Sequence, residues 1–265
     1  MHRSGTSLIT RWLQACGLHV GSSLLGPQTG NAEGHFEDND FVHLHQQLLK
    51  FQKLPHTGLT NRSVESIPTQ QETVVQTLVA LKSTLHDQWG WKDPRTCLFL
   101  NTYRKLLPAA RYIIILRNCQ YVVSSLLNRD HQGLNRYYLS KGNVYRFFLR
   151  MKKKYNKNWL YKTYAKKYLE IWIAYNEELL KHIEAIPPGS YIAMDYLSLL
   201  DDDKYFFKYL VDEWGLSMKY VGFKTLYKEQ LISQSINIAA LISDVSLLAK
   251  AQLLENRLYS TLLRH

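Results

Sequence analysis

The chain opens on a short run of residues suited to binding an oxyanion. Arg3 is followed by Ser4, Gly5, Thr6 and Ser7, so an arginine and three hydroxyl side chains surround one glycine. Apolar residues then recur at helical spacing up to position 16, which predicts a helix that begins at this loop. A helix N-terminus presents N–H groups and a positive dipole, and an arginine fork fits phosphate or sulfate. The alternative is an ordinary helix cap without a ligand.

Acidic residues follow this loop closely in the sequence. Glu33 and Glu37 stand shortly before an amphipathic pattern that predicts a helix over 40–50. A carboxylate beside an anion loop could act as a general base. The alternative is a capping cluster in which Asp38 or Asn39 begins the helix.

Two further cationic residues precede predicted helices. Lys92 comes directly before Asp93 and Pro94, a pair typical of a helix N-cap and first turn. Residues 111–116 include an apolar, β-branched run that predicts a buried parallel strand. Arg117 stands at the carboxyl end of that strand, where ligands bind in open α/β sheets.

A serine and a second arginine continue the pattern after Arg117. Ser125 follows it by eight residues and Arg129 follows Ser125 by four, both within a predicted helix. Either residue alone is consistent with a surface or capping position. The three together, after a buried strand, indicate a second anion site.

These segments resemble the sulfotransferases that use 3′-phosphoadenosine 5′-phosphosulfate (PAPS), in the variant whose loop carries arginine rather than lysine. The resemblance covers Arg3 to about Leu200 and rests on four separated motifs in the family's order. It implies an α/β, P-loop-like, three-layer fold with a central parallel sheet flanked by helices. It also implies PAPS as the donor substrate and no obligatory metal.

The resemblance further implies catalytic roles. Glu37 would be the general base, at the place where arginine-loop enzymes such as the tyrosylprotein sulfotransferases keep their glutamate, with Glu33 in reserve. Arg3 and Lys92 would stabilise charge on the bridging oxygen and the 5′-phosphate. The sulfonate would pass in line to a hydroxyl or amine of the acceptor.

Donor binding is implied for a larger set, which would contact the phosphates or the adenine of PAPS. Its members are Arg3, Ser4, Gly5, Thr6 and Ser7 at the 5′-phosphosulfate, Arg117, Ser125 and Arg129 at the 3′-phosphate, and Tyr196 of a Tyr-x-x-Leu element near the adenine.

The remaining patterns predict one domain over residues 1–265. A helix is expected over 69–87, with Val74, Leu78, Leu81 and Leu85 on one face, and another over 205–214. A buried strand is expected over 190–194, and apolar-striped helices over 235–264 suit packing on the domain or on a second copy. Only two residues precede Arg3, so we expect a truncated chain in which the strand leading into the loop is missing.

The positive charge is concentrated in one block. Eleven Lys and Arg residues, and no Asp or Glu, lie within 131–168, and eleven is also the net charge of the whole chain. Many tyrosines are interleaved with them. Such a block could bind an acidic glycan or a nucleic acid, or be a solvated helical face whose rings belong to the core. Its place after the donor motifs favours a helical insert or lid that binds an anionic acceptor, such as a glycan; nucleic acid is disfavoured.

Other function classes are disfavoured by what the sequence lacks. The loop has no Walker lysine, which argues against a kinase of small metabolites. No apolar run approaches the about 20 residues of a membrane helix. The three cysteines, at positions 16, 97 and 119, lack disulfide or zinc spacing, which favours a reducing, cytoplasmic location. A non-catalytic protein that binds polyanions stays the alternative to an enzyme.

Overall fold

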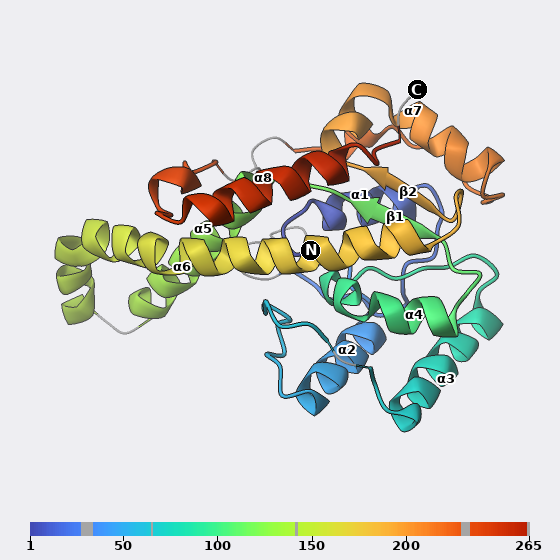
Figure 1. Ribbon diagram of the computed structural model, residues 1–265, viewed down its shortest axis with the longest axis horizontal. Helices are drawn as coiled ribbons and strands as arrows, with labels where there is room; N and C mark the ends of the chain where they lie inside the picture. Colours follow the sequence, from blue (N-terminus) through green and yellow to red (C-terminus); the bar gives the residue numbers. More distant parts are fainter. Residues whose placement is uncertain (28–33, 65, 141–142, 229–233, 264–265) are drawn as a thin grey trace.

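The computed structural model describes residues 1–27, 34–64, 66–140, 143–228 and 234–263; within them, the side chains at 138–139, 143–156 and 196 are not described. The elements follow one another as α1 (Thr6–Ala15), α2 (Asn39–Phe51), α3 (Thr69–Leu85), η1 (Pro94–Phe99), α4 (Leu100–Leu106), β1 (Tyr112–Ile115), α5 (Cys119–Leu139), α6 (Asn143–Ala185), β2 (Tyr191–Met194), α7 (Tyr196–Asp212), η2 (Phe223–Thr225), η4 (Ile238–Ala240) and α8 (Val245–Tyr259), where η marks a 3₁₀ helix (Figure 1).

The sheet is small and parallel. β1 pairs with β2 in a register that joins Tyr112 to Tyr191 and Ile115 to Met194. No third segment among the described residues pairs with either edge of this sheet. The broad central sheet expected from the sequence is therefore reduced to two strands, in a molecule made mostly of helices.

Helices cover both faces of the two strands. Successive side chains of a strand point to opposite faces, so each strand contributes to two clusters. Ile113, Ile115 and Ile192 belong to a buried cluster with residues of α1 and α7. Ile114 and Ala193 belong to a second cluster with α5, α6 and α8. The strands thus lie between two helical layers (Figure 1). Arg117 follows the end of β1 by two residues.

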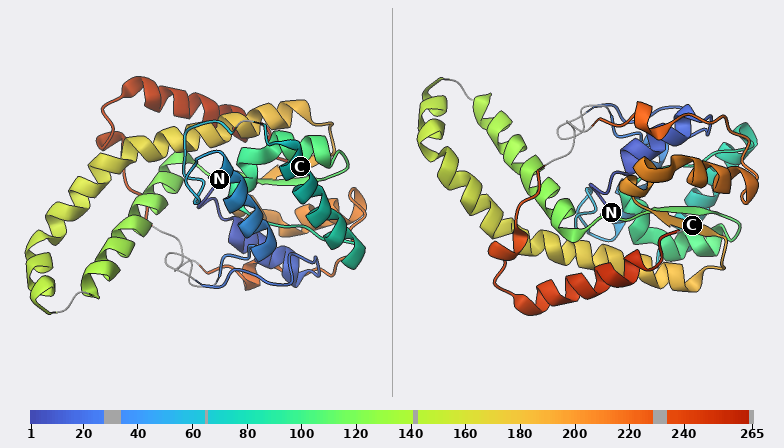
Figure 2. Two further views of the ribbon diagram at one scale, coloured as in Figure 1. Left: turned by 90° about the horizontal axis from the view of Figure 1, so that it is seen from below. Right: turned by 90° about the horizontal axis from the view of Figure 1, so that it is seen from above.

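The helices α5 and α6 form a long hairpin. They extend away from the sheet as two neighbouring arms, and α8 lies along the part of α6 nearer the sheet (Figure 2). The helix α6 begins at Asn143 and is 43 residues long, so it runs through most of the basic block and on to Ala185. Apolar side chains within the basic block, including Leu160 and Ala165, are buried in the core. This packing stabilises the helix where its other side chains are basic.

The helix α3 packs on α2 and α4 through a different face from the one expected. Val74, Leu81 and Leu85 are 47%, 55% and 62% exposed, whereas Val75 and Lys82 are buried. The apolar residues of α3 occupy two faces, and the third cluster of the core uses the face of Val75. The predicted helix is correct in its bounds to within two residues, but of the four residues expected on its buried face only Leu78 packs against the core.

None of the helices in the described part of the chain has both the length and the apolarity needed to cross a membrane.

Candidate active site

The N-terminal loop leads directly into α1. Gly5 has a φ of 91°, a left-handed conformation that glycine adopts without strain, and it caps α1 without a side-chain hydrogen bond. Ser4 is buried and Thr6 is the first residue of the helix. Arg117, just after β1, donates from a terminal guanidinium nitrogen to the Arg3 carbonyl at 2.7 Å. The end of the strand therefore holds the loop in place.

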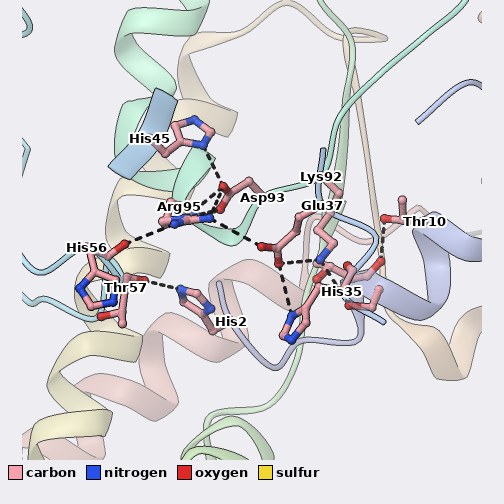
Figure 3. Close-up of polar contacts among 12 residues, drawn as sticks. His2, Thr10, His35, Glu37, His45, His56, Thr57, Lys92, Asp93 and Arg95 are labelled. Carbon is pink, nitrogen blue, oxygen red and sulfur yellow. Dashed lines mark hydrogen bonds and ion pairs between the residues drawn. The ribbon is translucent and has the colours of Figure 1, made fainter. Parts of the chain in front are cut away.

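Glu37, Lys92 and Ser7 meet at this loop, and Figure 3 shows the Lys92 side chain against the Glu37 carboxylate. The ammonium of Lys92 lies 2.9 Å from Glu37 Oε1 and 3.3 Å from Ser7 Oγ. Ser7 Oγ in turn donates to the carbonyl of His35 at 3.1 Å. Three segments far apart in the sequence thus bring a carboxylate, an ammonium and the anion loop into contact.

The Glu37 carboxylate is buried, with 7% of its side chain exposed, and it is surrounded by positive or proton-bearing groups. Arg95 lies 3.6 Å from Oε2 and His35 Nδ1 lies 3.7 Å from Oε1. Burial by itself would raise the pKa of Glu37, but His35 and Lys92 outweigh it and the pKa is lowered. The carboxylate is therefore ionised at neutral pH. Burial lowers the pKa of Lys92 by more than the negative charge of Glu37 raises it.

A buried polar network stands behind Glu37 (Figure 3). Arg95 contacts Asp93 through Nε at 2.8 Å and through a terminal nitrogen at 2.7 Å. Asp93 lies 3.0 Å from His45 Nδ1, and His45 Nε2 lies 2.8 Å from the Tyr103 hydroxyl. Burial by itself would raise the pKa of Asp93. The interactions with His45 and Arg95 outweigh burial and lower that pKa. The network fixes Arg95, which faces Glu37.

A cluster of arginines forms the other part of the site. Arg3 donates from Nε to Ser125 Oγ at 2.8 Å, and its main chain is bound by Arg117. Arg129 donates from Nε and from a terminal nitrogen to Oδ1 of its neighbour Asp130, at 3.1 and 3.0 Å. Burial, and then the positive charges of Arg129 and Arg117, lower the pKa of Arg3 to about 10. Three guanidinium groups close together favour an anion of high charge.

The remaining predicted site residues are less informative. Tyr196 begins α7 directly after β2, and its side chain is not among those described. Glu33 lies outside the described residues. Asp38 caps α2, as the alternative interpretation of the acidic segment expected, by accepting from the Asp40 N–H at 3.0 Å. No group of three or more His, Cys, Asp or Glu in the described ranges could hold a metal ion.

Sequence reasoning missed His35 and the network of His45, Arg95 and Tyr103. His35 has a signal in hindsight, because it stands two residues before Glu37 in the same short segment. Arg95 belongs to the block around Lys92, but nothing in the sequence indicates that its guanidinium turns toward Glu37. His45 and Tyr103 lie on different helices whose packing alone brings them together.

Comparison with protein families adds an independent finding. Residues 1–220 match the model of a family described as the sulfotransferase family, so the match covers the loop, Glu37, Lys92 and the arginine cluster. Comparison with curated proteins and with solved structures gives no match.

Proposed function

The chain belongs to the sulfotransferase family, and we propose that it moves a sulfonate group from PAPS to a hydroxyl or amine of an acceptor. One observation carries the proposal: the ammonium of Lys92 touches both Glu37 and Ser7 of the anion loop. That arrangement joins a proton acceptor to a site for the transferring group. We further propose that the two strands and their helical layers are a P-loop-like core.

The donor is bound by both parts of the site. The loop from Arg3 to Ser7, at the N-terminus of α1, takes the 5′-phosphosulfate. Arg117, Ser125 and Arg129 take the 3′-phosphate, with Arg129 turning from Asp130 to the ligand, and Tyr196 lies by the adenine. Support comes from the contact of Arg3 with Ser125, which makes the two phosphate sites adjacent.

The reaction is an in-line displacement at sulfur. The acceptor oxygen or nitrogen forms a bond to sulfur, and the bond from sulfur to the bridging oxygen breaks with its electron pair on the 5′-phosphate. Lys92 and Arg3 stabilise that developing negative charge. Glu37 takes up the proton that the acceptor loses. An anionic donor beside Lys92 competes with Glu37 for the ammonium and so frees the carboxylate.

The acceptor that we propose is anionic, such as an acidic glycan, and it binds on the α5–α6 hairpin. Lys157, Lys162 and Lys167 are exposed there, and Trp159 has 59% of its surface exposed. A flat ring beside ammonium groups suits a sugar face that carries carboxylates or sulfates. Tyr161 belongs instead to the core, so part of the aromatic pattern has a packing role.

A transfer experiment tests this function. Radiolabelled PAPS, with label in the sulfonate, is incubated with chemically desulfated heparin, which keeps its carboxylates. The wild type is expected to label the polysaccharide, and Arg3→Ala to bind heparin as before but to lose transfer, with Lys204→Ala as the surface control. A non-catalytic polyanion-binding protein would bind the heparin and leave PAPS intact.

A further inference from the structure

A helix that lies beyond the family match contacts the residues next to Arg117. The helix α8 follows residue 220, where the matched segment ends, and its Glu255 is buried, with 8% of its surface exposed. One oxygen of Glu255 accepts from Asn118 Nδ2 at 2.6 Å, and the other accepts from the Cys119 N–H at 2.9 Å. None of the roles above uses Glu255.

These contacts hold the first turn of α5, which begins at Cys119. Glu255 binds the Cys119 N–H, and Asn118 Oδ1 accepts from the Gln120 N–H at 2.8 Å. The first N–H groups of a helix have no partner within the helix, and a carboxylate that accepts from them also complements the helix dipole. The start of α5 is therefore held by a side chain that is 136 positions away in the sequence.

The helix α8 is itself fixed by packing. Ala251, Leu254 and Leu258 are buried, and they belong to the same cluster as Val122 and Val123 of α5. The packing of α8 against α6 adds to this support. The carboxylate of Glu255 is therefore presented to α5 from a defined place.

The guanidinium of Arg117 lies on the turn that Glu255 holds. Its Cζ is 5.6 Å from the ring centre of Tyr121, which stands in the first turn of α5. The Arg117 carbonyl accepts from Trp172 Nε1 at 3.3 Å, so the main chain is fixed from α6 as well. A shift of the first turn of α5 would move Tyr121 and change the direction of the Arg117 guanidinium relative to the rest of the arginine cluster.

We propose that Glu255 is a positioning residue for the donor: by holding the first turn of α5 it directs Arg117 toward the 3′-phosphate, and it thereby sets the preference of the site for a 3′-phosphorylated nucleotide. This inference rests on the proposed function and adds to it a determinant of donor selectivity from outside the matched segment. The negative charge of Glu255 would by itself repel a phosphate, so the residue acts through Arg117 rather than on the donor.

Calorimetry with 3′-phosphoadenosine 5′-phosphate (PAP) and with AMP, which lacks the 3′-phosphate, tests the proposal. The ratio of the two affinities is measured for the wild type, Glu255→Ala, Glu255→Gln, Arg117→Ala and the combination of Glu255→Ala with Arg117→Ala. Asp244→Ala is the matched control, because Asp244 caps the other end of α8 and pairs with Lys166. Its loss weakens the same helix through contacts that do not involve α5. Urea unfolding gives the stability of each variant.

We expect Glu255→Ala to lower the preference for PAP over AMP about 3- to 10-fold, as the loss of one hydrogen bond would, with AMP affinity within about twofold of the wild type. Glu255→Gln keeps an acceptor for the Cys119 N–H and should retain most of the preference. Both variants remove the negative charge, so charge cannot cause a difference between them. Glu255→Ala should have no further effect when Arg117 is already alanine, because the two residues act through one contact with the phosphate. Asp244→Ala should keep the wild-type ratio.

A ratio in Glu255→Ala that equals or exceeds the wild-type ratio would overturn the proposal. A further loss in the combined variant, or an equal loss in Asp244→Ala, would overturn it too, because either result would assign the effect to general damage. If Glu255→Ala does not fold, Glu255→Asp replaces it with the same expected loss, since its carboxylate is one methylene short of the Cys119 N–H. A wild type without any preference for PAP would instead overturn the proposed function.

Discussion

At the scale of single residues, Glu37 is where most charges of the site converge. Lys92, Arg95 and His35 all lie within 3.7 Å of its oxygens, and no part of this arrangement is exposed enough to be a simple surface ion pair. In the proposed reaction Lys92 serves the leaving group and Arg95 fixes the carboxylate, while His35 and Lys92 together outweigh burial and lower the pKa of Glu37. The proposed mechanism therefore makes Glu37 necessary for turnover and dispensable for donor binding.

Glu37→Gln is expected to lower turnover about 10²–10⁴-fold, because the amide cannot accept the proton that the acceptor loses. PAP affinity should change little, since the Glu37 carboxylate reaches the loop through Lys92, which stays in place. Steady-state kinetics together with calorimetry separates the two effects. Asp40→Asn is the control, because Asp40 pairs with Lys82 away from the site. Wild-type turnover in Glu37→Gln would show that this segment is structural.

At the scale of elements, sequence reasoning succeeded where a local signal exists. Asp38 and Asp93 cap their helices through hydrogen bonds of 3.0 and 2.8 Å, and both helix starts were predictable from residue type. It failed where packing decides. The buried face of α3 and the length of α6 depend on neighbouring helices, and so does the approach of Arg95 to Glu37. The pairing of the strands in a two-stranded sheet is likewise a property of the whole fold.

Gly58, between α2 and α3, gives a test of that packing. Its φ is +72°, and a Cβ there would lie 2.8 Å from Arg95 Cγ and 2.9 Å from the Tyr175 hydroxyl. Gly189 has a φ of +80° and nothing within 4 Å of such a Cβ. Gly189→Ala is expected to cost about 1–2 kcal/mol from the left-handed backbone alone. Gly58→Ala should cost a further about 1–3 kcal/mol from overpacking. Equal urea midpoints for the two variants would contradict this packing around Arg95.

The hairpin gives a second test at this scale. Replacing Lys157, Lys162 and Lys167 together by glutamine is expected to weaken the binding of desulfated heparin and to flatten its salt dependence, because exposed charges are screened over about 10 Å at 0.1 M salt. PAP affinity should stay as in the wild type. The control replaces three exposed lysines elsewhere, Lys204, Lys208 and Lys219. Loss of PAP affinity with heparin binding intact would mean that the hairpin covers the donor instead.

At the scale of the whole molecule, charge and burial are unevenly distributed. The net charge of +11 equals that of the basic block, so the rest of the chain is balanced. Part of the block is paired across elements, since Lys166 lies 2.9 Å from Asp244, the N-cap of α8. The two residues are 78 positions apart in the sequence, so the pair could not be predicted from the charges near Lys166. The core also holds polar groups far from the site, above all His182 of α6.

His182 predicts a pH dependence of stability. It is 1% exposed, neither ring nitrogen has a partner among the described residues, and burial, aided by the charge of Arg104, lowers its pKa to about 4. Below pH 6.5 the unfolded chain takes up a proton that the folded chain does not. Stability therefore falls as the pH drops, by about 1.6 kcal/mol between pH 6.5 and 5.

His182→Leu is expected to remove most of that loss and to cost little at pH 7.5, because an unpaired polar ring is replaced by an apolar side chain. Urea unfolding at the two pH values measures both. His86→Leu, on a partly exposed residue at the end of α3, is the control. An unchanged pH dependence in His182→Leu would assign the effect to other groups.

The central claim is that the loop and the arginine cluster together form a site for PAPS. Calorimetry with PAP and with AMP, which lacks the 3′-phosphate, tests it without any knowledge of the acceptor. We expect the wild type to bind PAP about 10- to 150-fold more tightly than AMP, as charged hydrogen bonds worth about 1.5–3 kcal/mol would give. Arg129→Ala should remove most of this preference and leave AMP affinity unchanged. Equal affinities of the wild type for PAP and AMP would contradict the account.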